Sequence, residues 1–339
     1  MTLGAPHIPS RCNDNTESQI AVEQRTSLPK AVRADGRPTG FGRWWYRHRL
    51  KIIPYFYIAP FFVLFAIFLA YPVIDSFWIS FHRQQGISTP QFVGLDNYIN
   101  LLADPRFKQS VINSTVYALG SLLLQIPLAF ILAVVVHSWL VPDLNVKSFY
   151  RLAFFVPLLT SGVVVALMFG ILYDYNSGLI NSYLMQWFGD NAKVGWVRDA
   201  RVVKFSIILL LIWQFTGLNS LYFLAGLQNI PRELEEAAAI DGANWFTVLT
   251  RITIPLLRPV ILFVVITAIN GSYQIFTQPY LLTGGGPRDQ SISMVMYLYN
   301  TGFSYFNLGY ASAIGYTLVL IVVTLAMINL RFFGAFRED

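Results

Sequence analysis

Six long apolar segments constrain this chain more than any other feature of its sequence. They cover residues 54–81, 111–137, 152–173, 203–227, 257–282 and 308–333. Each approaches or exceeds the roughly 20 residues that an α-helix needs to cross a bilayer. Only 12% of the 339 residues are charged, whereas soluble proteins have about 25%. The sequence therefore predicts an all-α, polytopic membrane protein with six transmembrane helices.

Basic residues beside these segments predict the orientation of the chain. Arg43, Arg47, Arg49 and Lys51 precede the first segment, as is typical of the cytoplasmic face. This orientation places 11 Lys and Arg residues inside and 8 outside. An even number of spans then puts both termini in the cytoplasm.

The expected organisation has four parts. Residues 1–42 form a disordered cytoplasmic tail, because they are polar and lack apolar periodicity. Residues 43–110 hold the first transmembrane helix and an external loop, 111–333 form a core domain, and 334–339 form a second cytoplasmic tail. The net charge of +6 does not indicate nucleic acid, since the bases flank apolar segments instead of clustering. The single cysteine and the scattered histidines predict no metal site.

A polar insert, residues 230–259, separates the fourth and fifth apolar segments. Pro231 suits the first turn of a helix, and the acidic residues that follow suit the positive end of its dipole. Three alanines continue the helix, and Gly242 suits a C-terminal cap. We expect a short helix, a turn, and a second helix that starts near Ala243 and runs into the next apolar segment.

The spacing of this insert resembles the EAA loop of bacterial ABC-importer permeases. Glu236-Ala237-Ala238 is followed four residues later by Gly242, and then by Ile252 and Pro255. The flanking residues are similar to the carbohydrate-uptake, maltose-type branch, and the resemblance covers about residues 56–333. Ile254 departs from it, because a leucine more often precedes this proline. The alternative is an ordinary amphipathic cytoplasmic loop.

This resemblance implies a type I permease fold and a coupling helix that docks in a groove of an ATP-binding subunit. The coupling residues would be Glu235, Glu236, Ala237, Ala238, Asp241, Gly242, Ile252 and Pro255. It implies a transport subunit without enzymatic activity or catalytic residues, in a bacterial plasma membrane. The implied partners are a homologous second permease (a heterodimer), two ATP-binding subunits that hold ATP and Mg²⁺, an extracytoplasmic solute-binding protein, and lipids. The chain itself would carry no cofactor, and it has no phosphate-binding P-loop sequence.

A second resemblance to sugar permeases lies in the last external loop, within Thr283-Gly284-Gly285-Gly286-Pro287. Glycine and proline here oppose both helix and strand, which predicts a shaped loop. In the family this loop faces the solute-binding protein, so Gly284, Gly285, Gly286 and Pro287 would contact it. A plain turn between helices is the alternative.

The apolar segments are nearly free of charge. Residues 112–136, 152–173, 205–231 and 259–287 contain no Asp, Glu, Lys, Arg or His. Ion-coupled transporters place such groups at depth, so the main alternative, an ion-coupled secondary transporter, lacks obvious coupling groups. A membrane enzyme or scaffold would need polar clusters that the sequence does not show. A neutral carbohydrate, a di- or oligosaccharide, is the favoured substrate; an amino sugar stays open, and glycerol phosphate is less favoured.

Neutral polar residues on the fourth and fifth segments are the candidates for a substrate pathway. They are Trp213, Gln214, Asn219, Asn270, Tyr273 and Gln274. The last three, with Gln278, recur at three- and four-residue intervals and would share one helix face. Amides can hydrogen-bond sugar hydroxyls, and aromatic rings can stack on sugar faces. In the family the pathway runs between the helices that flank the coupling loop. Alternatively, these amides only hold helices together.

Overall fold

The computed structural model describes residues 40–137 and 156–334. The chain divides into two units, Met1–Ile67 and Phe68–Asp339, each described by itself. Residues 68–110 thus belong with the larger unit, although the sequence grouped them with the first helix. In the smaller unit, α2 (Gly40–Phe65) begins within the stretch expected to be the disordered tail. Residues 1–39 and 335–339 of the two expected tails lie outside the described residues.

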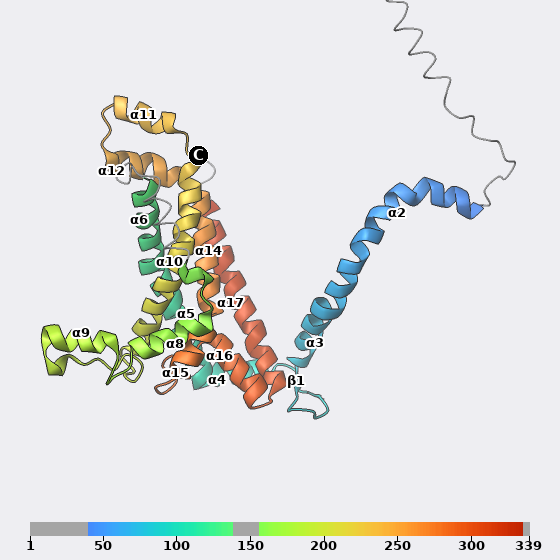
Figure 1. Cartoon of the computed structure of the whole chain (residues 1–339). Helices are drawn as coiled ribbons and strands as arrows, with labels where there is room; N and C mark the ends of the chain where they lie inside the picture. The colour runs from blue at the N-terminus through green and yellow to red at the C-terminus, as the bar shows by residue number, and fades with distance from the viewer. Residues whose placement is uncertain (1–39, 138–155, 335–339) are drawn as a thin grey trace, which may run out of the picture. The chain divides into compact units, whose positions relative to one another are not determined.

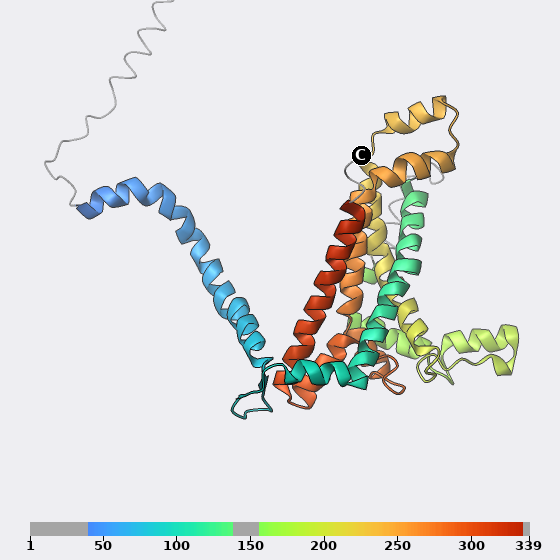
Figure 2. The same ribbon diagram turned by 180° about the vertical axis from the view of Figure 1, so that it is seen from behind.

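The larger unit is a bundle of long helices with short helices at both ends (Figures 1 and 2). Its long helical segments are α5 (Pro105–Gly120), η2 (Ser121–Gln125), α6 (Ile126–His137), α10 (Val203–Gln228), α14 (Arg258–Tyr273) and α17 (Leu308–Gly334). One end, called the α11 end, carries α11 (Arg232–Ile240), α12 (Trp245–Val248), η4 (Leu249–Thr253) and α13 (Ile254–Leu256).

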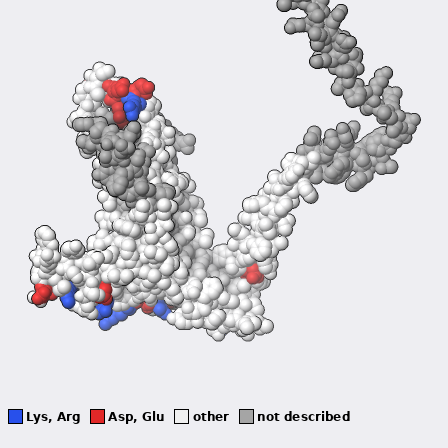
Figure 3. Space-filling model, in the orientation of Figure 1, with Lys and Arg blue, Asp and Glu red and all other residues white. Residues whose placement is uncertain are grey.

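The opposite end, called the α16 end, carries the remaining short elements. These are α3 (Tyr71–Ile79), β1 (His82–Arg83), β2 (Gln91–Phe92), α4 (Asp96–Ala103), α8 (Gly162–Leu172), α9 (Leu179–Phe188), η3 (Asp190–Ala192), α15 (Thr277–Thr283), α16 (Met294–Tyr299) and η5 (Asn300–Ser304). The π-helix η1 (Ala66–Ala70), which precedes α3, crosses the boundary between the two units. The two strands form a short antiparallel hairpin that pairs His82 with Phe92. In the face shown in Figure 3, charged side chains gather at the two ends and leave an uncharged band between them.

Four helical segments of the described residues are long and apolar enough to cross a membrane: Ile53–Ile79, Pro105–His137, Val203–Gln228 and Leu308–Arg331. The pair Trp245–Leu256 and Arg258–Tyr273 makes a fifth if it is counted as one span, bent by 69°. The third predicted segment, 152–173, lies partly outside the described residues. Its described helix α8 has 11 residues, too few to cross a bilayer alone. The count of six therefore stays a prediction.

Helix α10 lies at the centre of the bundle. Of its apolar window, 61% is buried, compared with 39% for Pro105–His137 and 22% for Leu308–Arg331. Glycines allow close contacts with its neighbours: a Cβ on Gly226 would lie 2.7 Å from Leu257 Cδ2 of the bend before α14. Such close approach through small residues is typical of helix packing in membranes. The helices that border α10 are therefore fixed tightly around it.

Candidate functional site

The polar insert forms the exposed helix α11. Pro231 occupies the N-cap position, one residue before the first turn in which the sequence placed it. Glu233 and Glu235 lie in the first turn, where the helix dipole favours negative charge, and Glu236 follows. No residue of α11 is buried. Among the coupling candidates, Ala237 and Asp241 are exposed, while Ala238, Ile252 and Pro255 are partly buried.

Gly242 ends α11 as the sequence predicted for a C-terminal cap. Its φ is +78°, in the left-handed region that glycine adopts without strain. The backbone N–H of Ala243 donates to Ala238 O at 2.9 Å, and that of Gly242 donates to Ala239 O at 3.1 Å. This pair of bonds is the Schellman motif, which satisfies the last helix carbonyls. The cap fixes the angle at which the chain leaves α11.

The second helix of the insert does not run straight into the next span, as the sequence had suggested. Asn244 caps α12 by accepting the Thr247 N–H at 2.8 Å. The helical path then continues through η4 and α13 and bends by 69° before α14. Pro259 lies in the first turn of α14; because it has no N–H, it cannot continue the helical hydrogen bonds across the bend.

Apolar side chains around α11 are strongly exposed, and the sequence reading missed them. The exposed fractions are 43% for Leu234, 87% for Ile240, 59% for Trp245 and 66% for Phe246. The sequence contained a signal for them, because Trp245 and Phe246 are two adjacent aromatic residues within a polar insert. Trp245 also lines a hollow of about 320 Å³, together with Arg232, Glu235, Glu236 and the end of α6. Clustered exposed apolar residues of this kind are typical of surfaces that contact another protein or a membrane.

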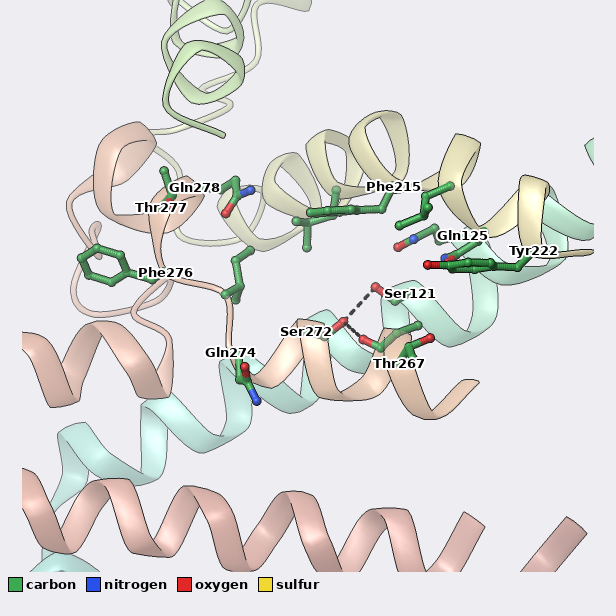
Figure 4. Close-up of a pocket in the computed structure, with 16 residues that line it drawn as sticks. Ser121, Gln125, Phe215, Tyr222, Thr267, Ser272, Gln274, Phe276, Thr277 and Gln278 are labelled. Carbon is green, nitrogen blue, oxygen red and sulfur yellow. Dashed lines mark hydrogen bonds between the residues drawn. The ribbon is translucent and has the colours of Figure 1, made fainter. Parts of the chain in front are cut away.

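A cavity of about 370 Å³ lies between α10, α14, η2 and the break before α15 (Figure 4). Its polar lining residues are Ser121, Gln125, Asn219, Tyr222, Thr267, Ser272, Gln274, Thr277 and Gln278, with Phe215 and Phe276 as aromatic walls. No Asp, Glu, Lys, Arg or His is among the residues that line it. The volume lies in the range of small-molecule pockets, about 300–1,000 Å³. The cavity can therefore offer hydrogen bonds and ring surfaces to a neutral ligand.

Two hydrogen bonds join the walls of this cavity. Ser272 Oγ donates to Ser121 Oγ at 3.0 Å, which connects α14 to η2. Gln278 Nε2 donates to Gln214 Oε1 at 2.8 Å, which connects α15 to α10. Both are side-chain contacts between helices that are far apart in sequence. Because α10 and α14 both line the cavity, a displacement of one relative to the other would change its width.

The structure brings together only part of the predicted pathway. Asn219 and Gln274 line the cavity. Gln214 does not line it, but its side chain accepts a hydrogen bond from Gln278, which does. Trp213 instead contacts the ring of Phe169 on α8, with 5.6 Å between centroids. Asn270 lies on a hollow between α14 and α17, and the buried Tyr273 hydroxyl bonds to Thr115 Oγ1 at 2.8 Å.

The expectation that Asn270, Tyr273, Gln274 and Gln278 share one continuous helix face is wrong, because α14 ends at Tyr273 and α15 begins at Thr277. Pro279 accounts for the break, since it has no N–H to give to the carbonyl of Ile275. The hydroxyl of Ser293 donates to that carbonyl instead, at 2.6 Å.

The glycine-rich loop has the irregular path that its sequence predicted, although Leu282 and Thr283 still belong to α15. Gly284 and Gly285 have φ values of +61° and +85°. Side chains of α5 hold the segment that follows: Asn113 Nδ2 donates to Asp289 O and Ile292 O, both at 2.9 Å. Arg106 forms a two-pronged ion pair with Asp289, at 3.0 and 2.9 Å. The sequence reading missed these α5 residues.

A second polar cluster at the α16 end surrounds Asp104, the N-cap of α5. Its carboxylate accepts hydrogen bonds from the hydroxyls of Tyr297 and Tyr310 and from two backbone N–H groups of α5. Burial acts to raise the pKa of Asp104, but these hydrogen bonds outweigh it and hold the pKa below its ordinary value. Burial and the bond to Asp104 raise the pKa of Tyr297. Asp104 therefore stays ionised and ties α5 to α16 and α17.

Helix α11 is exposed at one end of a bundle of apolar helices, and a neutral cavity lies within that bundle. Both features fit a membrane transport subunit that works with a partner. Comparison with known proteins agrees. The family described as "binding-protein-dependent transport system inner membrane component" matches residues 125–336. The arabinooligosaccharides transport system permease protein AraP of Bacillus subtilis is 36% identical over 291 residues, covering 85% of this chain and 91% of that protein.

Two further matches extend the comparison. The lactose transport system permease protein LacF of Rhizobium radiobacter is 32% identical, over 82% of this chain and 92% of its own length. A chain in the crystal structure of a bacterial alginate ABC transporter with an alginate pentasaccharide-bound periplasmic protein superposes with a TM-score of 0.76. That likeness has 21% identity and covers 88% of this chain and 99% of the other, so it establishes the fold.

The chain belongs to this family of binding-protein-dependent transport permeases, as residues 236–255 had indicated. It is a membrane-embedded transport component and not an enzyme. Its fold is that of ABC-importer permeases, as predicted. The roles of the individual coupling, pathway and loop residues stay predictions.

Proposed function

We propose that this chain is a permease subunit of an ATP-driven, binding-protein-dependent importer of neutral di- or oligosaccharides. One observation carries the proposal. Helices α10 and α14, which form two walls of the neutral cavity, are the helices joined by the exposed insert of α11 and α12. A force applied to α11 by a partner would therefore act directly on the cavity.

The partner at α11 is an ATP-binding subunit, which holds ATP and Mg²⁺. Ile240, Trp245 and Phe246 supply the apolar contact, and the carboxylates of Glu235 and Glu236 border it. Docking of such a helix in a groove is a common mode of protein recognition. Closure of two ATP-binding subunits moves α11, and the Gly242 cap and the bend at Leu257 transmit that motion to α10 and α14.

The substrate assignment follows from the cavity. Its amides and hydroxyls can donate and accept hydrogen bonds, and Phe215, Tyr222 and Phe276 can stack on sugar faces. The absence of charged residues from its lining disfavours an ionic substrate. The relatives named for arabinooligosaccharides and lactose support a sugar substrate. Asn219, Gln274 and Gln278 are the residues we assign to sugar contact.

The remaining assembly follows from the family. The chain pairs with a homologous permease in a bacterial plasma membrane, with both termini and α11 in the cytoplasm. The α16 end then faces the exterior, where the glycine-rich loop meets the solute-binding protein. Ion coupling is not favoured, because the residues that line the cavity include no Asp, Glu, Lys, Arg or His.

The test is ATP-dependent sugar uptake by the complete importer in proteoliposomes. Glu236→Lys on α11 is expected to lower uptake at least tenfold, while ATP hydrolysis by the partner subunits no longer responds to the solute-binding protein. The matched control is Asp190→Lys, the same charge reversal at an exposed carboxylate of the α16 end. Uptake at the wild-type rate by the Glu236 variant, or uptake driven by an ion gradient without ATP, would contradict the proposal.

A further inference from the structure

An open groove at the α16 end gathers basic side chains from two distant parts of the chain. It has a volume of about 610 Å³ and is lined by Lys193 and Arg198 from the α9–α10 connection and by Arg288 from the glycine-rich loop. Tyr175 and Asp199 also line it. Three cations and one carboxylate give the groove a positive charge.

The backbone presents Arg288 at the cost of local strain. Arg288 and Asp289 have φ values of +51° and +59°, a region that residues with a Cβ seldom occupy. The contacts of α5 keep Asp289 in place, through the Arg106 ion pair and the Asn113 hydrogen bond. The Tyr117 hydroxyl donates to Ser291 O at 3.0 Å and holds the other side of the turn. Strain that is maintained by surrounding contacts is typical of functional positions.

Hydrogen bonds also fix the other wall of the groove, which Tyr175 and Lys193 form. The amide of the buried Asn181 donates to Tyr175 O at 3.2 Å and to Val194 O at 3.0 Å. It thereby joins the backbone at Tyr175 to the backbone beside Lys193. Lys193 Nζ and Arg198 Cζ then lie 5.6 and 5.7 Å from the Tyr175 ring centroid, within the range of cation–π contacts.

Within the described residues these three cations make no ion pair, since Arg106 and Asp289 form the one that the structure contains there. The Asp199 carboxylate accepts the backbone N–H of Arg201 at 2.9 Å. Asp174, close to Arg198, accepts from the backbone and hydroxyl of Ser177, and these bonds lower its pKa. Neither acid forms an ion pair with these cations within the described residues, and the three cations outnumber the two acids, so the groove can accept external carboxylates.

We infer that this groove, Lys193, Arg198 and Arg288 around Tyr175, binds a carboxylate-bearing surface of the solute-binding protein. The inference rests on the proposed function and specifies the chemistry of that partner: acidic side chains that meet the groove when the partner docks. Complementary charge of this kind accelerates association and fixes the orientation of the two proteins.

An acidic cargo fits the observations less well than an acidic partner. The groove shares no lining residue with the central cavity. The cavity offers amides, hydroxyls and aromatic rings but no cation. An anionic sugar attracted to the groove would therefore lose its charged partners on moving inward. The cations serve a molecule that stays at the surface.

The experiment measures ATP hydrolysis by the complete importer in proteoliposomes against the concentration of its own solute-binding protein, purified separately. The variant replaces Lys193 and Arg288 by glutamine. The half-saturating concentration of the binding protein should rise roughly fivefold to tenfold, as expected for two exposed ion pairs, and its dependence on salt should weaken. The maximal rate should not change. A second variant, which combines Lys193→Gln with Arg288→Lys, keeps the charge at position 288 and should bind the solute-binding protein more tightly than the double glutamine variant.

The matched control replaces Arg83 and Lys108, two exposed bases of the same end that do not line the groove, and should leave the half-saturating concentration unchanged. An unchanged value in the groove variant would overturn the inference. So would a selective loss of uptake of a uronate-containing oligosaccharide, because the groove would then hold cargo. Failure of the proposed function looks different: the wild-type importer itself would show no ATP-dependent sugar uptake.

Discussion

The two ends of the bundle differ in where their polar and apolar groups find partners. At the α16 end, Asp104, Asn113 and Ser114 form hydrogen bonds with segments about 180 to 200 residues away in sequence. At the α11 end, no residue of α11 is buried and Ile240 is 87% exposed. The chain pairs these buried polar groups of the α16 end by itself, whereas it leaves every residue of α11 at least partly exposed.

This difference explains how a single subunit can be both rigid and responsive. Buried polar groups are costly to separate once they are paired, so the α16 end should move as one body. The α11 end has few internal contacts, and its position is set by whatever binds it. Mutations of the buried polar groups at the α16 end should therefore change stability, whereas mutations of the exposed residues at the α11 end should change the response to ATP.

The largest effect is expected from Gly309→Ala at the α16 end. An added Cβ would lie 1.9 Å from the backbone oxygen of His82, which cannot rotate away as a side chain can. Overpacking of this kind costs about 3 kcal/mol. The measurement is thermal unfolding of the purified complex in detergent. Gly271→Ala is the control, because its Cβ would meet nothing within 4 Å; equal stability of the two variants would contradict the close contact.

The next largest effect is expected from Asn113→Leu. Asn113 is fully buried and its amide donates to two carbonyls of the 284–293 loop. Leucine has a similar shape but leaves both carbonyls without that donor, at a cost of about 2 kcal/mol. Limited proteolysis should then cut the loop faster, and the complex should unfold at a lower temperature. Lys108→Ala is the control, because Lys108 is an exposed residue of the same helix, and it should change neither measurement by a comparable amount.

The two ends also differ in how far the sequence could predict them. The Gly242 cap and the exposed helix before it depend on residues within a dozen positions, so local rules predicted them. The hydrogen bonds that Asn113 donates to the 284–293 loop join residues more than 170 positions apart, and no local sequence pattern indicates them. The break between α14 and α15 could be predicted only in part from the sequence. Pro279 was visible, but its effect depends on Ser293, which supplies the missing donor.

Gly242→Ala at the α11 end should have a smaller effect on stability. No atom lies within 4 Å of an added Cβ, so the cost comes from the positive φ alone, about 1 kcal/mol. Uptake should nevertheless fall several-fold, because the exit angle of α11 changes. Gly242→Asn is the matched variant, since asparagine tolerates the left-handed region better, and it should retain more uptake than alanine. If alanine and asparagine reduced uptake equally, the cap would not be the cause.

The smallest effect, visible only in acid, is expected at Asp104. Its pKa is lowered in the folded chain from an ordinary value of 3.8, so the folded state favours the ionised form. The stability that this provides is fully present above about pH 5 and is lost as the pH falls through the folded-state pKa. Thermal unfolding of the wild-type complex from pH 6 down to pH 3 should therefore decline more steeply than that of Asp104→Asn, which cannot titrate. A parallel decline of the Asp104→Asn and wild-type complexes would show that the tyrosine hydrogen bonds do not favour the carboxylate. The polar contacts of the α16 end would then add no pH-dependent stability.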